Sequence, residues 1–377
     1  MTGRLPVTLV GGFLGAGKTS LLHHIISEHQ GGHLAILVET PGVLNLDAKA
    51  LRGLCGAMRR TNDAIFEIPD GEEMAQVQAV AACLRDLAGA GRYERVLIEI
   101  AGTASPAWLG EHFLAGGACN EWGHLEQIIC VVDALDYFHA GRGPAAQASL
   151  LAFQDEQIAG ATLVVLNKCD LLQDEERKLC LDALKKAHCD SRVIETAYGE
   201  VPPEIWAQPA DRAELVAALD RRAALPPAEL PPLSSALYRV HRPFHPARFW
   251  DWYNADHPGL LRVKGLIWLA TRNLLVGGVS RTRWENACGP AGIWWAALPR
   301  EEWPEEPAAL VRMQETWREP YGDRRQELVL IGEVAPLSGP LRRELDACLL
   351  TDEEMARPLN EWAALPDPFP AWNLEDD

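Results

Sequence analysis

The chain has 377 residues, of which 48% are apolar and 23% are charged. These proportions exclude global disorder, and the length exceeds one ordinary compact core, so we expect two domains. The formal net charge of −18 would repel phosphate backbones and anionic lipid, which argues against nucleic acid and membrane surfaces as partners.

The cysteines and the start of the chain indicate a cellular location. Nine cysteines are scattered singly, without a C-x-C or C-x-x-C pair. The first residues show no charged leader before an apolar block, and no run approaches the ~18 apolar residues of a membrane span. We therefore expect free thiols in a reducing cytoplasm.

Short apolar runs alternate with helical patterns in the first two hundred residues. Several runs are continuous Val, Ile and Leu, which is typical of strands buried on both faces of a parallel sheet. The alternation predicts an α/β domain with a mostly parallel sheet over residues 1–200. The predicted strands are Val7–Val10, Ala35–Val38, Ile65–Ile68, Val96–Ile100, Ile128–Val132, Leu163–Leu166 and Arg192–Ile194.

The composition changes after the seventh run. Repeated prolines predict a linker over residues 201–235, with one helix at Arg212–Ala223. Ten of the thirteen tryptophans lie from Trp250 onward. Residues 236–365 are predicted to form a smaller C-terminal α+β domain, and residues 366–377 an acidic tail. The predicted elements of the C-terminal domain are the strands Leu261–Ala270 and Glu327–Gly332 and the helix Leu341–Leu349.

A glycine-rich loop follows the first predicted strand. Residues Gly12–Thr19 fit the pattern G-x-x-x-x-G-K-[ST], in which backbone N–H groups and a helix N-terminus converge on phosphate oxygens. Lys18 would reach the β- and γ-phosphates, and the Thr19 hydroxyl would ligate Mg²⁺. The alternative is a glycine-rich turn without a ligand. The predicted nucleotide contacts here are Gly12, Gly15, Ala16, Gly17, Lys18, Thr19 and Ser20.

A second motif, Asn167-Lys168-Cys169-Asp170, follows the strand Leu163–Leu166. Guanine offers two adjacent donors that one carboxylate, Asp170, can accept together, whereas adenine would leave that carboxylate unpaired. Asn167 would hold the edge of the ring, and the Lys168 stem would cover the face of the base. The alternative is a strand-end turn with surface polar residues. The two motifs together predict a site for GTP and GDP.

Carboxylates at two other strand ends are candidates for the chemistry. Glu99, in Glu99-Ile100-Ala101-Gly102, would hold Mg²⁺ or its water shell, unless it only caps the next helix. Asp133 is interpreted as structural. Gly42 and Asp47 follow the second strand, where Asp47 would orient water or Mg²⁺. Lys18, Glu99 and Asp47 are therefore the candidate catalytic residues, with Thr19 and Glu99 as Mg²⁺ ligands.

In combination, the motifs resemble the CobW-like family of P-loop GTPases, which includes relatives of the urease and hydrogenase nickel-insertion GTPases. The likeness covers nearly the whole chain, and its last stretch, Gly322–Val329, is most similar to the subgroup of the family linked to zinc. It implies a GTP-hydrolysing metallochaperone that gives a transition metal, often zinc, to a client protein. Beyond the motifs already given, the likeness lies in Gln157-Ile158, Glu195-Thr196-Ala197-Tyr198-Gly199, Arg262–Ala270, Trp294-Trp295 and Gly322–Val329.

The sequence departs from the family pattern where a transition metal would bind. The family's C-x-C-C motif is replaced by Gly71-Glu72-Glu73-Met74-Ala75, which has no thiolate, the ligand that holds zinc tightly. The family's Asn-Glu-Phe-Gly-Glu run is replaced by Glu39-Thr40-Pro41-Gly42-Val43. The transition-metal site is therefore unknown.

Three functions remain open at this point. The first is a slow, partner-stimulated Mg²⁺-dependent GTPase that acts as a metallochaperone-like or maturation factor. The second is a nucleotide-gated module that binds a client protein with little hydrolysis and no metal cargo. The third is metal delivery through Glu72, Glu73 and a histidine or Cys83; a small-molecule kinase ranks behind all three. The client and the oligomeric state stay open.

Overall fold

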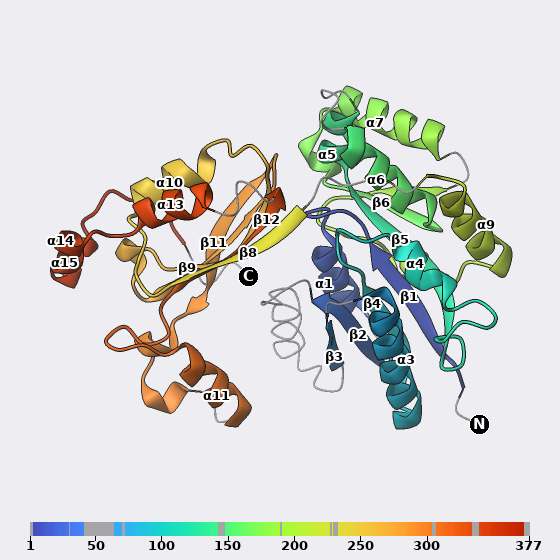
Figure 1. Cartoon of the computed structure of the whole chain (residues 1–377), viewed down its shortest axis with the longest axis horizontal. Coiled ribbons are helices and arrows are strands. Elements are labelled where there is room, and N and C mark those ends of the chain that lie inside the picture. The colour runs from blue at the N-terminus through green and yellow to red at the C-terminus, as the bar shows by residue number, and fades with distance from the viewer. Residues whose placement is uncertain are drawn as a thin grey trace. The chain divides into compact units, whose positions relative to one another are not determined.

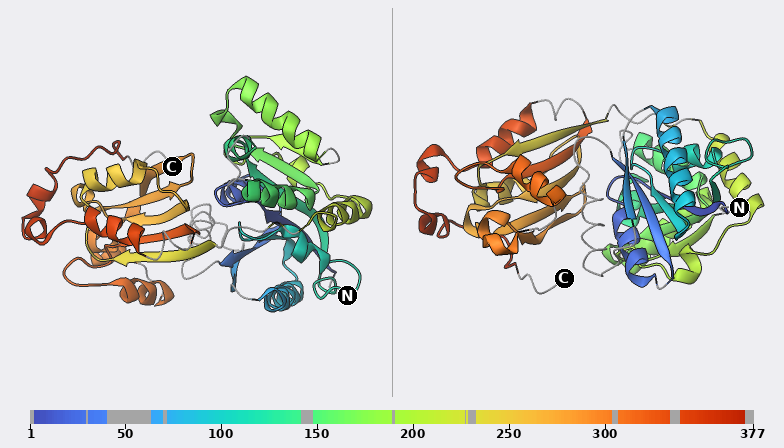
Figure 2. Two further views of the ribbon diagram at one scale, coloured as in Figure 1. Left: turned by 45° about the horizontal axis from the view of Figure 1, so that its top comes forward. Right: turned by 90° about the horizontal axis from the view of Figure 1, so that it is seen from below.

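The computed structural model describes residues 3–29, 31–40, 64–69, 72–141, 148–188, 191–226, 228, 233–303, 307–333 and 339–372. The chain divides into two compact units, Met1–Pro231 and Pro232–Asp377, which Figures 1 and 2 show in three views. The boundary thus falls within the predicted linker.

The first unit is built on a seven-stranded sheet with the order β3-β2-β4-β1-β5-β6-β7. Every neighbouring pair is parallel, which confirms the predicted sheet. Six of the seven predicted runs lie within these strands, and the seventh, Val96–Ile100, extends one residue beyond β4. They are β1 (Leu5–Gly11), β2 (His33–Thr40), β3 (Ala64–Pro69), β4 (Tyr93–Glu99), β5 (Gly123–Asp133), β6 (Leu163–Asn167) and β7 (Arg192–Glu195).

Helices cover both faces of this sheet (Figure 1). Successive residues of β4 show the two layers, since Ile98 packs with α3 residues such as Leu84 and Leu97 packs with α1 residues such as Leu21. This burial on both faces explains why the strands are continuous apolar runs. The helices are α1 (Lys18–Glu28), α3 (Glu73–Ala90), α4 (Pro106–Glu111), α5 (Ala134–Ala140), α6 (Ala148–Ala159), α7 (Asp174–Ala187), α8 (Pro203–Trp206) and α9 (Arg212–Ala223).

The stretch predicted as a linker differs from that expectation. Helix α9 has the predicted bounds, but it packs into the first unit through Leu215 and Leu219, and Trp206 of α8 is 1% exposed in the core on the other face of the sheet. These large apolar side chains outweigh the nearby prolines, because burying each one stabilises the unit by roughly 2–3 kcal/mol. Residues 201–226 are therefore part of the first unit.

The second unit contains a five-stranded antiparallel sheet with the order β11-β10-β9-β12-β8. Helices α10 and α13 pack on one face of it (Figure 1), where Phe244 and Phe249 stack with ring centroids 4.4 Å apart. The strands are β8 (Leu233–Val240), β9 (Leu260–Ile267), β10 (Leu275–Arg281), β11 (Asn286–Ile293) and β12 (Gln326–Glu333). The helices are α10 (Pro246–Asn254), α11 (Pro307–Thr316), α13 (Pro340–Cys348), α14 (Asp352–Met355) and α15 (Leu359–Trp362).

Part of the predicted tail is also packed. Asp367 accepts hydrogen bonds from Arg272 Nε at 2.9 Å and Nη2 at 3.1 Å, and Phe369 is 5% exposed in the core of the second unit. Residues 366–372 thus belong to this unit, whereas residues 373–377 lie outside the described part of the chain.

The Gly322–Val329 stretch, noted for its family likeness, holds the second unit together. The Asp323 carboxylate accepts backbone N–H groups from Trp295 at 3.1 Å and Ala296 at 2.9 Å. The Gln326 amide accepts from Trp268 N at 3.0 Å and donates to Trp268 O at 2.9 Å. Its polar side chains are thus engaged by the fold.

Every helix in the described part of the chain falls short of the length and hydropathy that a bilayer span requires.

Candidate nucleotide-binding site

The glycine-rich loop connects the carboxyl end of β1 to the amino end of α1. Gly12, Gly15 and Gly17 have φ angles of 131°, 84° and 104°, a conformation that side chains rarely adopt. A Cβ on Gly17 would also lie 2.2 Å from Asn167 Nδ2. The loop therefore needs its glycines, as the motif predicted.

The loop and the start of α1 form a positive pole. Lys18 is the first residue of α1 and is 8% exposed. Its Nζ donates to Gly12 O at 2.8 Å and Phe13 O at 3.4 Å. No side chain caps α1, and its first turn has no acidic residue. A helix N-terminus beside a lysine ammonium suits an anion such as a nucleotide phosphate.

Thr19 and Glu99 meet beside this pole. The Thr19 Oγ1 and Glu99 Oε1 atoms are 3.5 Å apart, because Glu99 ends β4, which pairs with β1 at Val10. Glu99 is 5% exposed. Two oxygens bound to one Mg²⁺ at ~2.1 Å and a right angle lie about 3 Å apart. These two side chains therefore fit the predicted Mg²⁺ site.

The segment after Glu99 is clamped from two sides. The Glu39 carboxylate, on β2, accepts Ala101 N at 2.6 Å and Gln76 Nε2 at 2.7 Å. On the other side, Gln157 Nε2 of α6 donates to Ala104 O at 2.7 Å. A Cβ on Gly102 would lie 2.8 Å from Leu14 N, so the segment 101–104 lies directly against the phosphate loop.

Sequence reasoning did not assign a role to Glu39 or Gln76. The available signal was the position of Glu39, a lone acidic residue near the carboxyl end of an apolar strand. Its neighbour Val38 pairs with Glu99 across β2 and β4, and the carboxyl ends of parallel strands share one sheet edge. Gln76 gave no such signal, since it lies within a helical pattern.

Asn167 joins the phosphate loop to the loops beyond β6 and β7. Its Nδ2 donates to Ala16 O at 2.9 Å, and its Oδ1 accepts Gly199 N at 2.9 Å. The side chain is 1% exposed. In this arrangement both ends of the amide hydrogen-bond to the protein, and the predicted contact of Asn167 with the ring edge stays a prediction.

Lys168 and Asp170 belong to the same turn, Lys168 largely covered and Asp170 exposed. Lys168 has a φ of 61°, and its Nζ lies 2.8 Å from Asp133 Oδ2. The other oxygen of Asp133 caps α5 by accepting Leu135 N at 3.0 Å. Burial raises the pKa of Asp133, and the Lys168 ammonium opposes that shift. Asp133 thus anchors Lys168 as well as α5, while the Asp170 side chain remains exposed.

The loop after β7 packs against both nucleotide motifs. Cys169 N donates to Thr196 O at 3.1 Å, and Gly199 approaches the start of α1 so closely that a Cβ would lie 2.6 Å from Leu21 N. Tyr198, with a φ of 56°, is 73% exposed. The structure therefore brings the phosphate loop, the Asn167–Asp170 turn and this loop into one site.

Several predicted metal positions are not brought together. Glu72 occupies the N-cap position of α3 without a capping side-chain hydrogen bond, and Glu73 is the first residue of the helix; both side chains are exposed. Cys83 lies ten residues further along the same helix, about 15 Å from Glu73 at 1.5 Å per residue. Burial raises the pKa of Cys83 to about 11, which disfavours the thiolate. One ion therefore cannot bind both Glu73 and Cys83.

Two further observations limit the metal assignment. Asp47 and Gly42 fall in residues 41–63, outside the described residues. Within the described ranges, no three His, Cys, Asp or Glu side chains come together closely enough to hold a metal ion.

The fold and the site define a P-loop nucleotide-binding protein with a turn suited to guanine. Two family models match the chain: "CobW/HypB/UreG, nucleotide-binding domain" over residues 6–195 and "Cobalamin synthesis protein cobW C-terminal domain" over residues 233–349. The chain belongs to the CobW/HypB/UreG family, and it is a GTP-binding protein that hydrolyses GTP.

Individual relatives are distant. The chain is 27% identical to "Zinc-regulated GTPase metalloprotein activator 1" of Dictyostelium discoideum, over 97% of this chain and 84% of that protein. It is 28% identical to "Zinc chaperone CobW" of Pseudomonas aeruginosa, over 53% of this chain and 58% of that protein. Zn(II)-bound YjiA GTPase from E. coli is 17% identical with a TM-score of 0.37, covering 92% of this chain and 100% of that one.

Proposed function

We propose that the chain is a slow Mg²⁺-dependent GTPase in which Thr19 and Glu99 hold the ion and Asp170 selects guanine. The observation that carries the proposal is the 3.5 Å approach of Thr19 Oγ1 to Glu99 Oε1, next to the buried Lys18. The predicted nucleotide contacts from Gly12 to Ser20 all belong to this loop and the first turn of α1.

Each residue then has a physical task. Lys18 and the α1 N-terminus stabilise negative charge on the transferred phosphoryl group, and Mg²⁺, when bound, neutralises further charge there. Glu99 or Asp47 positions the attacking water. Phosphoryl transfer depends mainly on such positioning, so a partner that completes the site would accelerate turnover.

We further propose that hydrolysis serves a metallochaperone-like or protein-maturation role toward a client protein. The support is the family and the names of the relatives, of which the first is a zinc-regulated metalloprotein activator and the second a zinc chaperone. Zinc is therefore the first metal to test as cargo. The client is unidentified, and no transition-metal ligand is assigned.

A second function, a nucleotide-gated module that binds a client with little hydrolysis and no metal cargo, is favoured by four of the described cysteines. Burial raises the pKa of Cys119, Cys130, Cys288 and Cys348 to about 12. Such thiols form thiolates, the tight zinc ligands, only at a cost.

The two functions are separated by measuring GTP turnover with Mg²⁺, without and with one equivalent of Zn²⁺, beside a zinc-affinity competition. Tight zinc binding that changes the turnover rate supports the metallochaperone. GTP turnover without a tight zinc site rejects zinc as cargo and supports the nucleotide-gated module. A turnover no faster than that of GTP in buffer would favour the nucleotide-gated module over the GTPase.

A further inference from the structure

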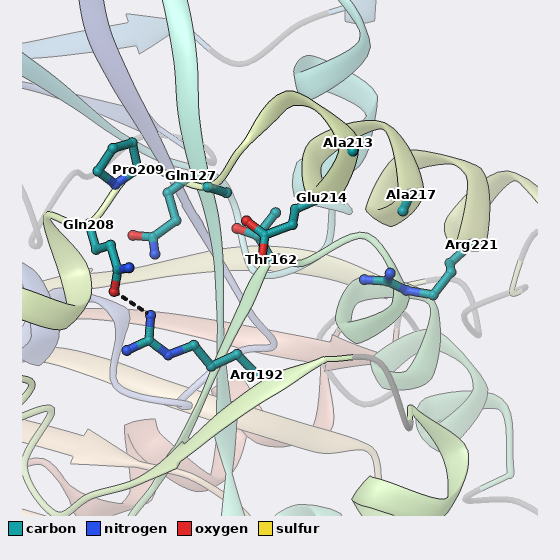
Figure 3. A pocket seen from close by; sticks show the side chains of 10 residues that line it. Gln127, Thr162, Arg192, Gln208, Pro209, Ala213, Glu214, Ala217 and Arg221 are labelled. Atoms are coloured by element: carbon teal, nitrogen blue, oxygen red, sulfur yellow. Dashed lines mark hydrogen bonds between the residues drawn. The ribbon is translucent and has the colours of Figure 1, made fainter.

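A cavity of about 380 Å³ lies in the first unit, between α9 and strands β5 to β7. Figure 3 shows that Ala213, Glu214, Ala217 and Arg221 face it from one helix, while Gln127 and Arg192 face it from strands. Its volume lies within the roughly 300–1,000 Å³ typical of small-molecule sites. Its remaining lining residues are Thr162, Gln208, Pro209 and Ala210.

The cavity is separate from the nucleotide site. Arg192 begins β7, and Thr162 directly precedes β6. Both therefore lie at the amino edge of the parallel sheet, whereas the phosphate loop follows the carboxyl end of β1. Gln127 lies six residues before Asp133 on β5, about 20 Å at 3.3 Å per residue. A ligand here would not overlap GTP.

Two polar side chains lining the cavity have buried atoms that lack hydrogen-bond partners among the described residues. Gln127 is 3% exposed. Its Nε2 donates weakly to Ile205 O at 3.4 Å, but its Oε1 accepts no hydrogen bond. Arg221 Nη2 donates to Ala161 O at 3.0 Å, whereas its Nε has no acceptor. Leaving a buried polar atom unsatisfied costs about 1–3 kcal/mol, so each of these atoms would gain from a water or ligand group that pairs with it.

The charges of the lining select the ligand. Arg192 and Arg221 are cationic. Arg221 donates to the carbonyl oxygen of Ala161, and Arg192 Nη1 donates to Gln208 Oε1 at 2.8 Å, so both acceptors are neutral oxygens. Glu214 is the single acidic residue of the lining, and it accepts Asp211 N at 2.9 Å. Two positive charges against one negative charge favour an anion, although the chain as a whole carries −18.

We propose that this cavity binds a small carboxylate that also carries an amino or hydroxyl group. The carboxylate would pair with a guanidinium, for which a planar bidentate geometry is available. The amino or hydroxyl group would donate to Gln127 Oε1, satisfying the buried acceptor. A phosphate dianion fits less well, because Glu214 repels its second charge.

The test uses the full chain saturated with GDP and Mg²⁺, so that the phosphate loop cannot take up the added anions. L-Glutamate, L-lactate, L-malate and inorganic phosphate are titrated by calorimetry. At least one of the three carboxylates is expected to bind with a Kd in the millimolar range or below, and more tightly than phosphate. Arg221→Gln should weaken that binding by at least ten-fold.

Two variants control for folding and for general charge. Ala217→Leu fills the cavity without changing its charge, and leucine suits this exposed position of a helix. The variant should lose carboxylate binding while it still binds GDP. Arg212→Gln removes a positive charge from the same helix outside the lining and should leave binding unchanged. The proposal fails if no carboxylate binds, which would leave a water-filled cavity, or if Ala217→Leu binds as well as the natural chain.

Discussion

Among the four residues from Asn167 to Asp170, three side chains are buried or paired within the fold and one is exposed. Asn167 and Cys169 are buried, and Lys168 is paired with Asp133. Only Asp170 has an exposed side chain. The carboxylate is thus held in position by a turn whose other members are fixed, which is the condition for recognising a base by geometry.

Asp170→Asn should weaken GTP binding by about 10- to 100-fold, because hydrogen bonds to a charged group contribute about 1.5–3 kcal/mol. ATP has no matching donor pair, so its weaker binding should change little. Both affinities are measured by calorimetry in Mg²⁺ buffer. Equal losses for the two nucleotides would remove the guanine assignment from Asp170.

At the scale of secondary-structure elements, the clamp around residues 101–104 links β2, α3 and α6 to the end of β4. Glu39 holds Ala101 N, and Gln157 holds Ala104 O. The clamp therefore fixes the segment that follows Glu99 and lies against the phosphate loop. If that segment positions the γ-phosphate or water, its loss should affect turnover more than binding.

Glu39→Ala should lower GTP turnover at least ten-fold while GDP affinity changes less than three-fold. The substitution leaves Ala101 N and the Gln76 amide without their carboxylate, which also costs about 1–3 kcal/mol of stability. Single-turnover hydrolysis and GDP titration measure the two effects. Glu111→Ala, at an exposed position of α4, is the matched control. Parallel losses of turnover and GDP affinity in Glu39→Ala would show a general disruption instead.

In the second unit, an ion pair joins α10 to α14. Arg248 Nη2 lies 2.7 Å from Glu354 Oε2, and Arg248 Nη1 lies 3.0 Å from Glu354 Oε1. These hydrogen bonds lower the pKa of Glu354 from its ordinary 4.5 to about 2. Because the folded-state pKa is the lower one, the pair stabilises the unit above pH 4.5 and loses that effect as the pH falls toward 2.

Glu354→Gln should therefore destabilise the second unit at pH 7 by about 1 kcal/mol or less, since the pair is partly exposed. Urea unfolding at pH 7, 4 and 2.5 should show the difference from the natural chain shrinking over that range. A difference that is constant with pH would mean that the effect of Glu354 does not depend on its charge.

The predictability of the fold differs between the two units. All seven strands of the parallel sheet could be found from apolar runs, because burial on both faces leaves few polar residues in them. The strand β10 was missed because it contains Gly277 and Gly278, and β11 because it contains Gly289 and Pro290, residues that are rare in strands. Such strands form because they pair with strands that are distant in the sequence. A local residue pattern therefore does not predict them.

The site was predictable only in part for a similar reason. The loop glycines, Lys18 and the Asn167–Asp170 turn have fixed local spacing and were found. The contacts of Glu39 with Ala101, and of Asp133 with Lys168, join residues that are distant in sequence. Parallel pairing brings them to one sheet edge, and no single-sequence spacing encodes that distance. The roles of the predicted site residues remain for the binding and turnover measurements.

At the scale of the whole molecule, the two compact units should respond differently to nucleotide. Every assigned nucleotide contact lies in the first unit, Met1–Pro231. GDP at about 100 times its Kd should stabilise that unit by about 2.7 kcal/mol, because it binds only the folded form. In hydrogen exchange, globally protected amides of β1 and β5 should then exchange about 100-fold more slowly, and those of β9 and β12 should not change. Lys18→Ala is the control and should lose the effect. Equal protection of both sheets would show that the units unfold as one cooperative structure, since binding to one would then stabilise both.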